Sequence, residues 1–228
     1  MKRSEINKAI RDMEQMLGEY KFSLPEFCGF TPEKWKSLGH EYDEVRDNAL
    51  GWDITDVGED RFTELGFSLI TLRNGSWEDR ERYPKPYAEK LLMMYESQSF
   101  PLHFHFYKME DIINRGGGNV IITVYNSTPD GRLSDEDVKV TCDGHTYTVP
   151  AGTGIRLVPG SSITVQQYLY HSFSVEPGTG PVLLGEISMC NNDNADNRFY
   201  EEYGRFPKIE EDEPPYRLLC NEYPPAEG

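Results

Sequence analysis

From about residue 60 onward, apolar and polar residues alternate in short runs separated by turn-forming residues. Successive side chains of a β-strand point to opposite faces, so alternation with period two predicts strands. Asn74-Gly75 and Asp143-Gly144 are dipeptides typical of tight turns between such strands. We expect strands at residues 67–72, 89–95, 103–107, 120–125, 138–142, 146–149, 154–158, 162–166, 170–175 and 182–189. Many short strands with regular turns predict a β-sandwich or a β-barrel.

The first 60 residues predict helices instead. Apolar residues recur on one helical face at Ile6, Ile10, Met13 and Leu17. We therefore expect a helix over residues 4–19, with Ser4 as its N-cap. A second helix is expected to start at Thr31-Pro32-Glu33, because Thr31 can cap it and proline suits its first position. A third helix is expected over residues 42–50.

These patterns divide the chain into three parts. Residues 1–60 form an N-terminal helical region, residues 61–209 a β-barrel, and residues 210–228 an acidic, proline-rich tail that we expect to pack on the barrel. We find no internal repeat and no low-complexity linker between these parts.

The charge of the chain limits its partners. It carries 39 acidic and 23 basic residues, a formal net charge of −16. Nucleic acids and anionic membranes are bound by basic surfaces, and no run of Lys and Arg occurs here, so we expect neither partner. No apolar run reaches the ~20 residues of a membrane span, and the charged N-terminus does not resemble a signal peptide. Four widely spaced cysteines without a C-x-x-C pair indicate reduced thiols in a cytoplasmic protein.

The segment His103-Phe-His105 carries the strongest sign of chemistry. On a strand, His103 and His105 point to the same face and can converge on one ion. Glu110 lies just past the strand, where the chain can bend back toward them. Nitrogen and oxygen ligands without thiolate suit Mn, Fe, Co, Ni or Zn. An isolated H-x-H is a weak signal by itself, and the residues that follow it decide its meaning.

The spacing His103, His105, Glu110, Gly117 resembles the first motif of the cupins, although Ser97 replaces the glycine that usually precedes it. This resemblance implies a mainly β fold: a cupin barrel, that is, a double-stranded β-helix or jelly roll, with the N-terminal helices packed on it. The second cupin motif is poorer, since Gln166-Gln167-Tyr168 stands in place of its Pro-x-Gly.

The fourth metal ligand then has two candidates. His171 lies in an expected strand and is the better one, whereas His145 follows a hairpin turn, where an exposed histidine is common.

A longer stretch narrows the resemblance. Pro101-x-His-Phe-His, Lys108-x-Glu-Asp111 and Ile112 to Gly118 together are similar to the D-lyxose ketol-isomerase family of cupin-type sugar isomerases, over roughly residues 60–200. The resemblance implies a divalent metal, typically Mn²⁺, with Co²⁺, Zn²⁺ or Fe²⁺ as alternatives. It also implies interconversion of D-lyxose and D-xylulose, with related activity on D-mannose and D-fructose.

Aldose–ketose isomerisation moves a hydrogen between C1 and C2, which requires a proton carrier and a cation for the developing oxyanion. Glu186 interrupts an apolar run and is our candidate for the proton carrier, and Lys90 is the comparable cation. Proton transfer through an enediol is the preferred mechanism, and a hydride shift stays open. Either residue could instead point outward from its strand.

Four residues are our candidates for binding substrate hydroxyls: Lys90, Lys108, Asp193 and Arg198. Asp193 and Arg198 belong to a loop rich in Asn and Asp, which taken alone is more often a solvated turn. Lys108 and Asp111 could also support the metal ligands or lie at an interface.

Two other functions compete with an isomerase. Three His and one Glu also serve cupin dioxygenases and decarboxylases, and a non-catalytic sugar-binding cupin is the third possibility. The polar set around Lys90 and Glu186 favours a polyol substrate. Because exposed barrel edges gain from being covered, we expect a homodimer.

Overall fold

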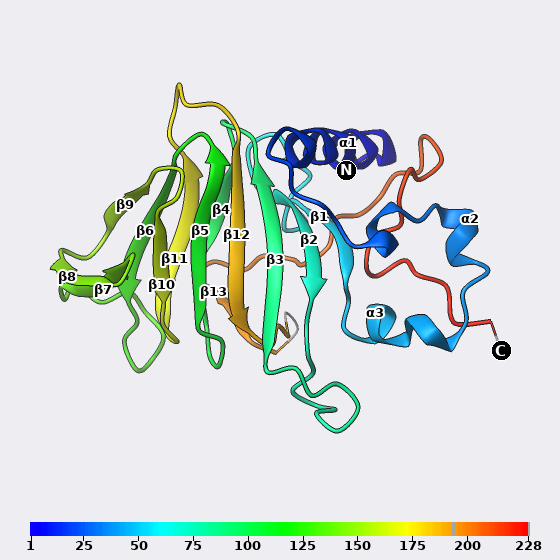
Figure 1. Ribbon diagram of the computed structural model, residues 1–228. Helices are drawn as coiled ribbons and strands as arrows, with labels where there is room; N and C mark the ends of the chain where they lie inside the picture. The colour runs from blue at the N-terminus through cyan, green and yellow to red at the C-terminus, as the bar shows by residue number, and fades with distance from the viewer. Residues whose placement is uncertain (193–194, 228) are drawn as a thin grey trace.

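The computed structural model describes residues 1–192 and 195–227. Its body consists of two antiparallel sheets that pack face to face, with the helices gathered beside β1 (Figure 1). The larger sheet has the order β1 (Gly51–Thr55), β2 (Phe67–Arg73), β3 (Tyr87–Met94), β12 (Val182–Met189), β5 (Glu110–Gly117), β10 (Ser162–Val165), β7 (Val138–Cys142) and β8 (His145–Val149). The smaller sheet has the order β13 (Asn197–Phe199), β4 (Ser99–His105), β11 (Leu169–Val175), β6 (Val120–Asn126) and β9 (Thr153–Leu157). The expected mainly β barrel is confirmed.

The space between the two sheets holds the main apolar core. Leu92 and Leu184 enter it from the larger sheet, and Ile122, Val124 and Phe173 enter it from the smaller one. These side chains are buried, as the alternation of apolar and polar residues predicts for strands that bury one face.

A second apolar cluster lies on the outer side of the larger sheet, beneath α1 (Arg3–Glu19). The face of α1 that carries Ile6, Ile10, Met13 and Leu17 packs on Trp52, Ile70 and Leu91, among other residues of β1 to β3. The predicted helix is therefore present.

The predicted cap of α1 is wrong. The helix begins one residue earlier, and the carboxylate of Glu5 accepts a hydrogen bond of 2.7 Å from the N–H of Lys2. Ser4 lies inside the helix, where its backbone N–H and its hydroxyl both donate to Asp212 of the tail. A tertiary contact with the tail thus uses the side chain that the local pattern assigned to the cap.

Short helices and the C-terminal tail pack together beside β1. They comprise η1 (Glu26–Gly29), α2 (Pro32–Trp35), η2 (His40–Tyr42) and α3 (Asp43–Asp47). Thr31 caps α2 as predicted, since its Oγ1 accepts a hydrogen bond from the N–H of Lys34. The tail stacks Tyr223 on Trp35 and donates the N–H of Cys220 to the carbonyl of Trp52 in β1. None of the helices in the described residues combines the length and the apolar character needed to cross a membrane.

Three strands, β1, β5 and β13, were not expected from the alternation. The most consequential is β5, whose glycines we expected to form a turn into the next strand. Gly116 and Gly117 continue the strand instead, with φ of +155° and +83°, and a bulge in the pairing with β12 falls at Leu183 and Leu184. A Cβ on Gly116 would lie 2.3 Å from the ring of Tyr20, the residue that follows α1, and a φ of +155° is unfavourable for other residues, so this position favours glycine.

Candidate metal centre and active site

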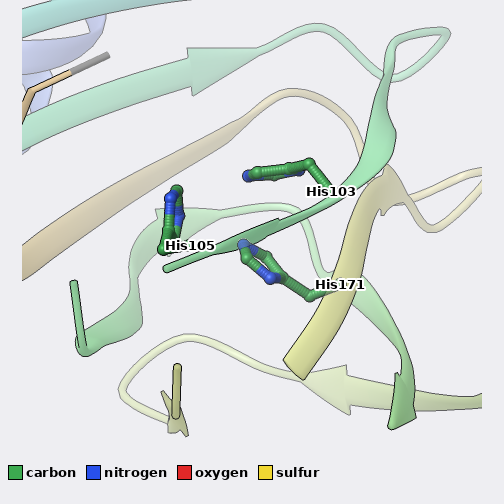
Figure 2. A group of neighbouring side chains, drawn as sticks. All are labelled: His103, His105 and His171. Carbon is green, nitrogen blue, oxygen red and sulfur yellow. The ribbon is translucent and has the colours of Figure 1, made fainter. Parts of the chain in front are cut away.

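Three buried histidines from two adjacent strands converge on one point. His103 and His105 lie on β4, and His171 lies on β11 directly opposite His103 in the pairing of the two strands. One ring nitrogen of each lies within 4.8 Å of the others. Figure 2 shows the three imidazole rings turned toward a common space.

Backbone carbonyls set the orientation of two of these rings. Nδ1 of His103 lies 2.8 Å from the carbonyl oxygen of Pro101, and Nδ1 of His171 lies 3.0 Å from that of Leu169. A carbonyl can only accept, so Nδ1 carries the proton in both rings and the lone pair is left on Nε2. Both Nε2 atoms are thereby available as ligands.

The fourth donor reaches this point from the opposite sheet. Glu110 is the first residue of β5, and its Oε1 lies 3.1 Å from Nε2 of His171 and 3.4 Å from Nε2 of His105. The turn between β4 and β5 is held by Asp196, whose carboxylate accepts the backbone N–H groups of Tyr107 and Lys108. This turn brings Glu110 back to the histidines.

This donor set fits a divalent cation. Among the described residues, both ring nitrogens of His105 and Nε2 of His171 are buried without a hydrogen-bond partner of good geometry. Lone pairs of imidazole nitrogens and a carboxylate oxygen that face one another at 3.1–3.4 Å repel unless a cation lies between them. Three nitrogens and one carboxylate suit Mn, Fe, Co, Ni or Zn.

The protonation states agree with metal binding. Burial, together with the neighbouring His171 and His105, lowers the pKa of His103 well below its ordinary value. Burial and the Lys108 ammonium likewise lower the pKa of His105. Burial alone would raise the pKa of Glu110, but Lys108 and His105 outweigh it, and this pKa lies well below its usual range. His103 and His105 are therefore neutral imidazoles, and Glu110 is an ionised carboxylate.

A group of charged side chains, Lys90, Lys108 and Glu186, adjoins the metal donors. The Nζ of Lys108 lies 2.6 Å from Oε2 of Glu110 and 2.9 Å from Oε1 of Glu186. The Nζ of Lys90 lies 3.2 Å from the same oxygen of Glu186. Burial alone would lower the pKa of Lys108, but the carboxylates of Glu110 and Glu186 outweigh it and raise this pKa.

Lys90 and Glu186 face the interior of the barrel. They are opposite partners in the pairing of β3 with β12, with 4% and 5% of their surfaces exposed. The outward orientation considered for each of them is therefore wrong. Glu186 is surrounded by ammonium groups as well as by the apolar neighbours that its own strand suggested.

The structure does not place Arg198 beside Lys90, Lys108 and Glu186. Arg198 is exposed, and its guanidinium lies against Gly131 and over the ring of Phe104 at 6.0 Å. Its neighbours on β13, Asn197 and Phe199, are the residues that line the cavity. Because side chains alternate along a strand, Arg198 must face outward, which corrects its predicted role as a substrate contact.

Two further candidates remain, Asp193 as a substrate contact and His145 as the fourth metal ligand. Asp193 lies outside the described residues. His145 begins β8 at the far edge of the larger sheet, where it is exposed and stacks on Tyr147. Of the two candidates for the fourth ligand, His171 is the one that joins the cluster.

A cavity connects the metal donors with the lysines. Its polar lining comes from His103, His105, Lys108, Glu110, Glu186, Lys90, Thr55, Asn197 and Arg205. Phe100, Phe173 and Phe199 form an aromatic side. Sequence reasoning missed Arg205, which forms an ion pair with the buried Asp53. No local pattern around Arg205 could have revealed it, because it follows the last strand and reaches the cavity only through the tertiary fold.

Comparison with known proteins identifies the family. The D-lyxose isomerase family model matches residues 1–223. A D-lyxose/D-mannose isomerase of Serratia proteamaculans is 45% identical over 224 residues, covering 98% of each chain. A protein of the same description from Escherichia coli O157:H7 is 44% identical over the same length and coverage.

Solved structures show the same fold at low identity. An L-ribose isomerase of Cellulomonas parahominis with L-ribose superposes with a TM-score of 0.59 at 14% identity, covering 92% of this chain and 98% of that one. The L-ribose isomerase of Geodermatophilus obscurus gives a TM-score of 0.54 at 13% identity, covering 91% and 98%. This chain, with its cupin-type fold and its three-histidine centre, is an isomerase that belongs to the D-lyxose isomerase family.

Proposed function

We propose that this chain is a metal-dependent aldose–ketose isomerase that interconverts D-lyxose with D-xylulose and D-mannose with D-fructose. The observation that carries the proposal is the buried carboxylate of Glu186, held between Lys90 and Lys108 beside the donors His103, His105, Glu110 and His171. The relatives described as D-lyxose/D-mannose isomerases support this choice of sugars. Cupin dioxygenases, decarboxylases and sugar-binding cupins share the ligands, but the family membership favours the isomerase.

The four donors would hold the metal, which when bound polarises the sugar carbonyl. Glu186 takes the proton from the carbon beside the carbonyl and returns it to the neighbouring carbon, at the carboxylate that faces the cavity. Lys108 and Lys90 donate to the substrate oxygen on which negative charge develops. Their ammonium groups already lie within 3.2 Å of Glu186 and need little rearrangement.

The walls of the cavity support this chemistry. Phe100, Phe173 and Phe199 limit the access of water to the enediol, which would otherwise lose or exchange its protons. Arg205, rather than Arg198, supplies a guanidinium to the lining and is our proposed contact for a hydroxyl further along the sugar chain.

The test is ketose formation from D-lyxose and from D-mannose by EDTA-treated protein, with and without added Mn²⁺. We expect turnover to disappear with the chelator and to return with the metal. Bound metal without turnover on either sugar would contradict the proposed reaction. Deuterium from solvent at the transferred position would support the enediol over a hydride shift, whereas a Glu186 shielded from water can return the original proton and leave no deuterium.

Three finer points belong to the same proposal. We infer Mn²⁺ as the ion from the resemblance to the D-lyxose ketol-isomerase family, and the donor set of nitrogen and oxygen atoms is compatible with it as with Fe, Co, Ni or Zn. We infer a homodimer, supported by exposed apolar side chains on and beside β12, namely Ile187, Met109 and Tyr107, and light scattering in solution would test it. We infer a cytoplasmic location, supported by four cysteines that form no disulfide within the described part of the chain.

A further inference from the structure

A side-chain amide behind the cavity touches both lysines. Asn191 follows the end of β12, and its Oδ1 accepts a hydrogen bond of 2.7 Å from Nζ of Lys90. The same oxygen lies 3.4 Å from Nζ of Lys108. For Lys90 this bond is shorter than the 3.2 Å contact with Glu186, so Asn191 is its closer partner.

Asn191 is itself held at both of its backbone polar groups by one side chain. Oδ1 of Asn74 accepts the N–H of Asn191 at 2.9 Å, and Nδ2 of Asn74 donates to the carbonyl of Asn191 at 3.0 Å. Asn74 lies just past the end of β2 and is 5% exposed. Its amide therefore fixes the position at which the chain leaves β12.

The same amide extends the connection to the helical region. Nδ2 of Asn74 also lies 3.4 Å from the carbonyl of Asn48, which follows α3, and Nδ2 of Asn48 lies 3.5 Å from the carbonyl of Asn74. Segments that follow α3, β2 and β12 thus meet in one largely buried network, which ends on the lysines through the half-buried Asn191. Buried networks of this kind restrict side chains that are otherwise flexible.

The charge of the site explains the use of an amide rather than a carboxylate. Lys90 and Lys108 are opposed by Glu110 and Glu186, so the four charges of the group sum to zero. An amide oxygen accepts from the ammonium groups without adding a third negative charge. It holds the lysines without adding a third carboxylate to compete with Glu110 and Glu186 for them.

On this basis we propose that Asn191, clamped by Asn74, is a positioning residue that places the Lys90 and Lys108 ammonium groups beside Glu186. The inference rests on the proposed isomerase function and deepens it. Asn191 acts through the lysines, so its loss should affect the chemical step more than the binding of sugar or metal.

The experiment compares the Mn²⁺-loaded wild type with Asn191→Ala, Asn191→Asp, Asn74→Ala and the double variant. Hydrogen bonds to charged groups contribute enough that we expect kcat of Asn191→Ala on D-lyxose to fall about 10- to 100-fold. The KM of Asn191→Ala should stay within about threefold of the wild-type value, and its metal content and Tm should equal those of the wild type. Asn191→Asp, which keeps an oxygen at the same place, should retain more kcat than Asn191→Ala.

Two comparisons separate positioning from general structure. Asn74→Ala should also lower kcat. The kcat of the double variant should be no lower than that of Asn191→Ala, because both changes act on the same contact between Asn191 and the lysines. Asn192→Ala is the matched control: its side chain bonds Glu78 in an exposed loop, and we expect wild-type kcat.

A kcat of Asn191→Ala within about twofold of the wild type would overturn the inference. A loss that only follows reduced metal content or Tm, or an equal loss in Asn192→Ala, would overturn it as well. Should Asn191→Ala fail to fold, the inference is tested on Asn74→Ala and Asn191→Asp. Absence of isomerase turnover in the wild type would refute the proposed function instead.

Discussion

Oε1 of Glu110 lies 3.1 Å from Nε2 of His171, although the two residues belong to opposite sheets and are 61 positions apart in the sequence. The contact forms because the turn after β4 reverses the chain and places the first residue of β5 against the histidines. The metal donors therefore join the two layers of the barrel at the end of its apolar core.

His171→Ala should lose both metal and isomerase activity, because it removes one of three converging imidazoles. Metal content of the purified protein and ketose formation measure the two effects. His145→Ala is the control, since that histidine is exposed and distant, and it should keep both. Full metal occupancy in His171→Ala would contradict its role as a ligand.

Glu186→Gln should keep the metal and lose about 100-fold or more in kcat, because an amide cannot accept the transferred proton. Steady-state kinetics with metal analysis tests this. Glu89→Gln lies on β3 and loses only an ion pair with the partly exposed Arg73, so its kcat should stay normal. A fully active Glu186→Gln would show that another group moves the proton.

Lys108→Met should destabilise the metal-free protein by about 3 kcal/mol, because it leaves Glu110 and Glu186 buried without their shared cation. Urea unfolding of the EDTA-treated protein measures the change. Arg61→Ala breaks only the exposed pair with Glu64 and should change stability by less than about 1 kcal/mol. Equal effects of the two variants would contradict the compensation by Lys108.

The metal-free protein should lose stability as the pH falls from about 7.5 through 6.5 toward 5.5. The pKa values of His103 and His105 are lowered on folding, so the unfolded chain binds protons first and is favoured by acid. Thermal unfolding with EDTA across this range measures the slope. The variant His103→Gln/His105→Gln should flatten it, and a wild-type Tm independent of pH would refute the assignment.

Gly116→Ala should destabilise the protein by about 2 kcal/mol or more, because its Cβ would overlap the ring of Tyr20. Gly18→Ala is the matched control in α1, where a Cβ meets nothing within 4 Å. That change should be neutral or should stabilise by up to about 1 kcal/mol. Chemical denaturation of both variants checks the contrast, which a tolerated Gly116→Ala would contradict.

Local pattern alone determined much of this protein. Period-two alternation predicted most strands of the barrel, and the strand geometry of His103 and His105 predicted a shared metal face, because both depend on neighbours along the chain. The same alternation predicted that His171 and Glu186 lie in strands. The spacing from His103 to Gly117 indicated a cupin, and the longer run from Pro101 to Gly118, with Lys108 and Asp111, indicated the family.

The contacts between residues of different strands, helices and loops were decided only by the tertiary structure. Ser4 bonds Asp212 of the tail instead of capping α1, and Gly116 and Gly117 of β5 continue a strand because they pair with Leu183 and Val182 of β12. Arg198 faces outward because it lies between Asn197 and Phe199, whose side chains point into the cavity. Arg205 and Asn191 lie in irregular segments and reach the site only through the tertiary fold. These contacts join residues far apart in sequence, so they follow from how the sheets and helices pack and not from the propensity of any one segment.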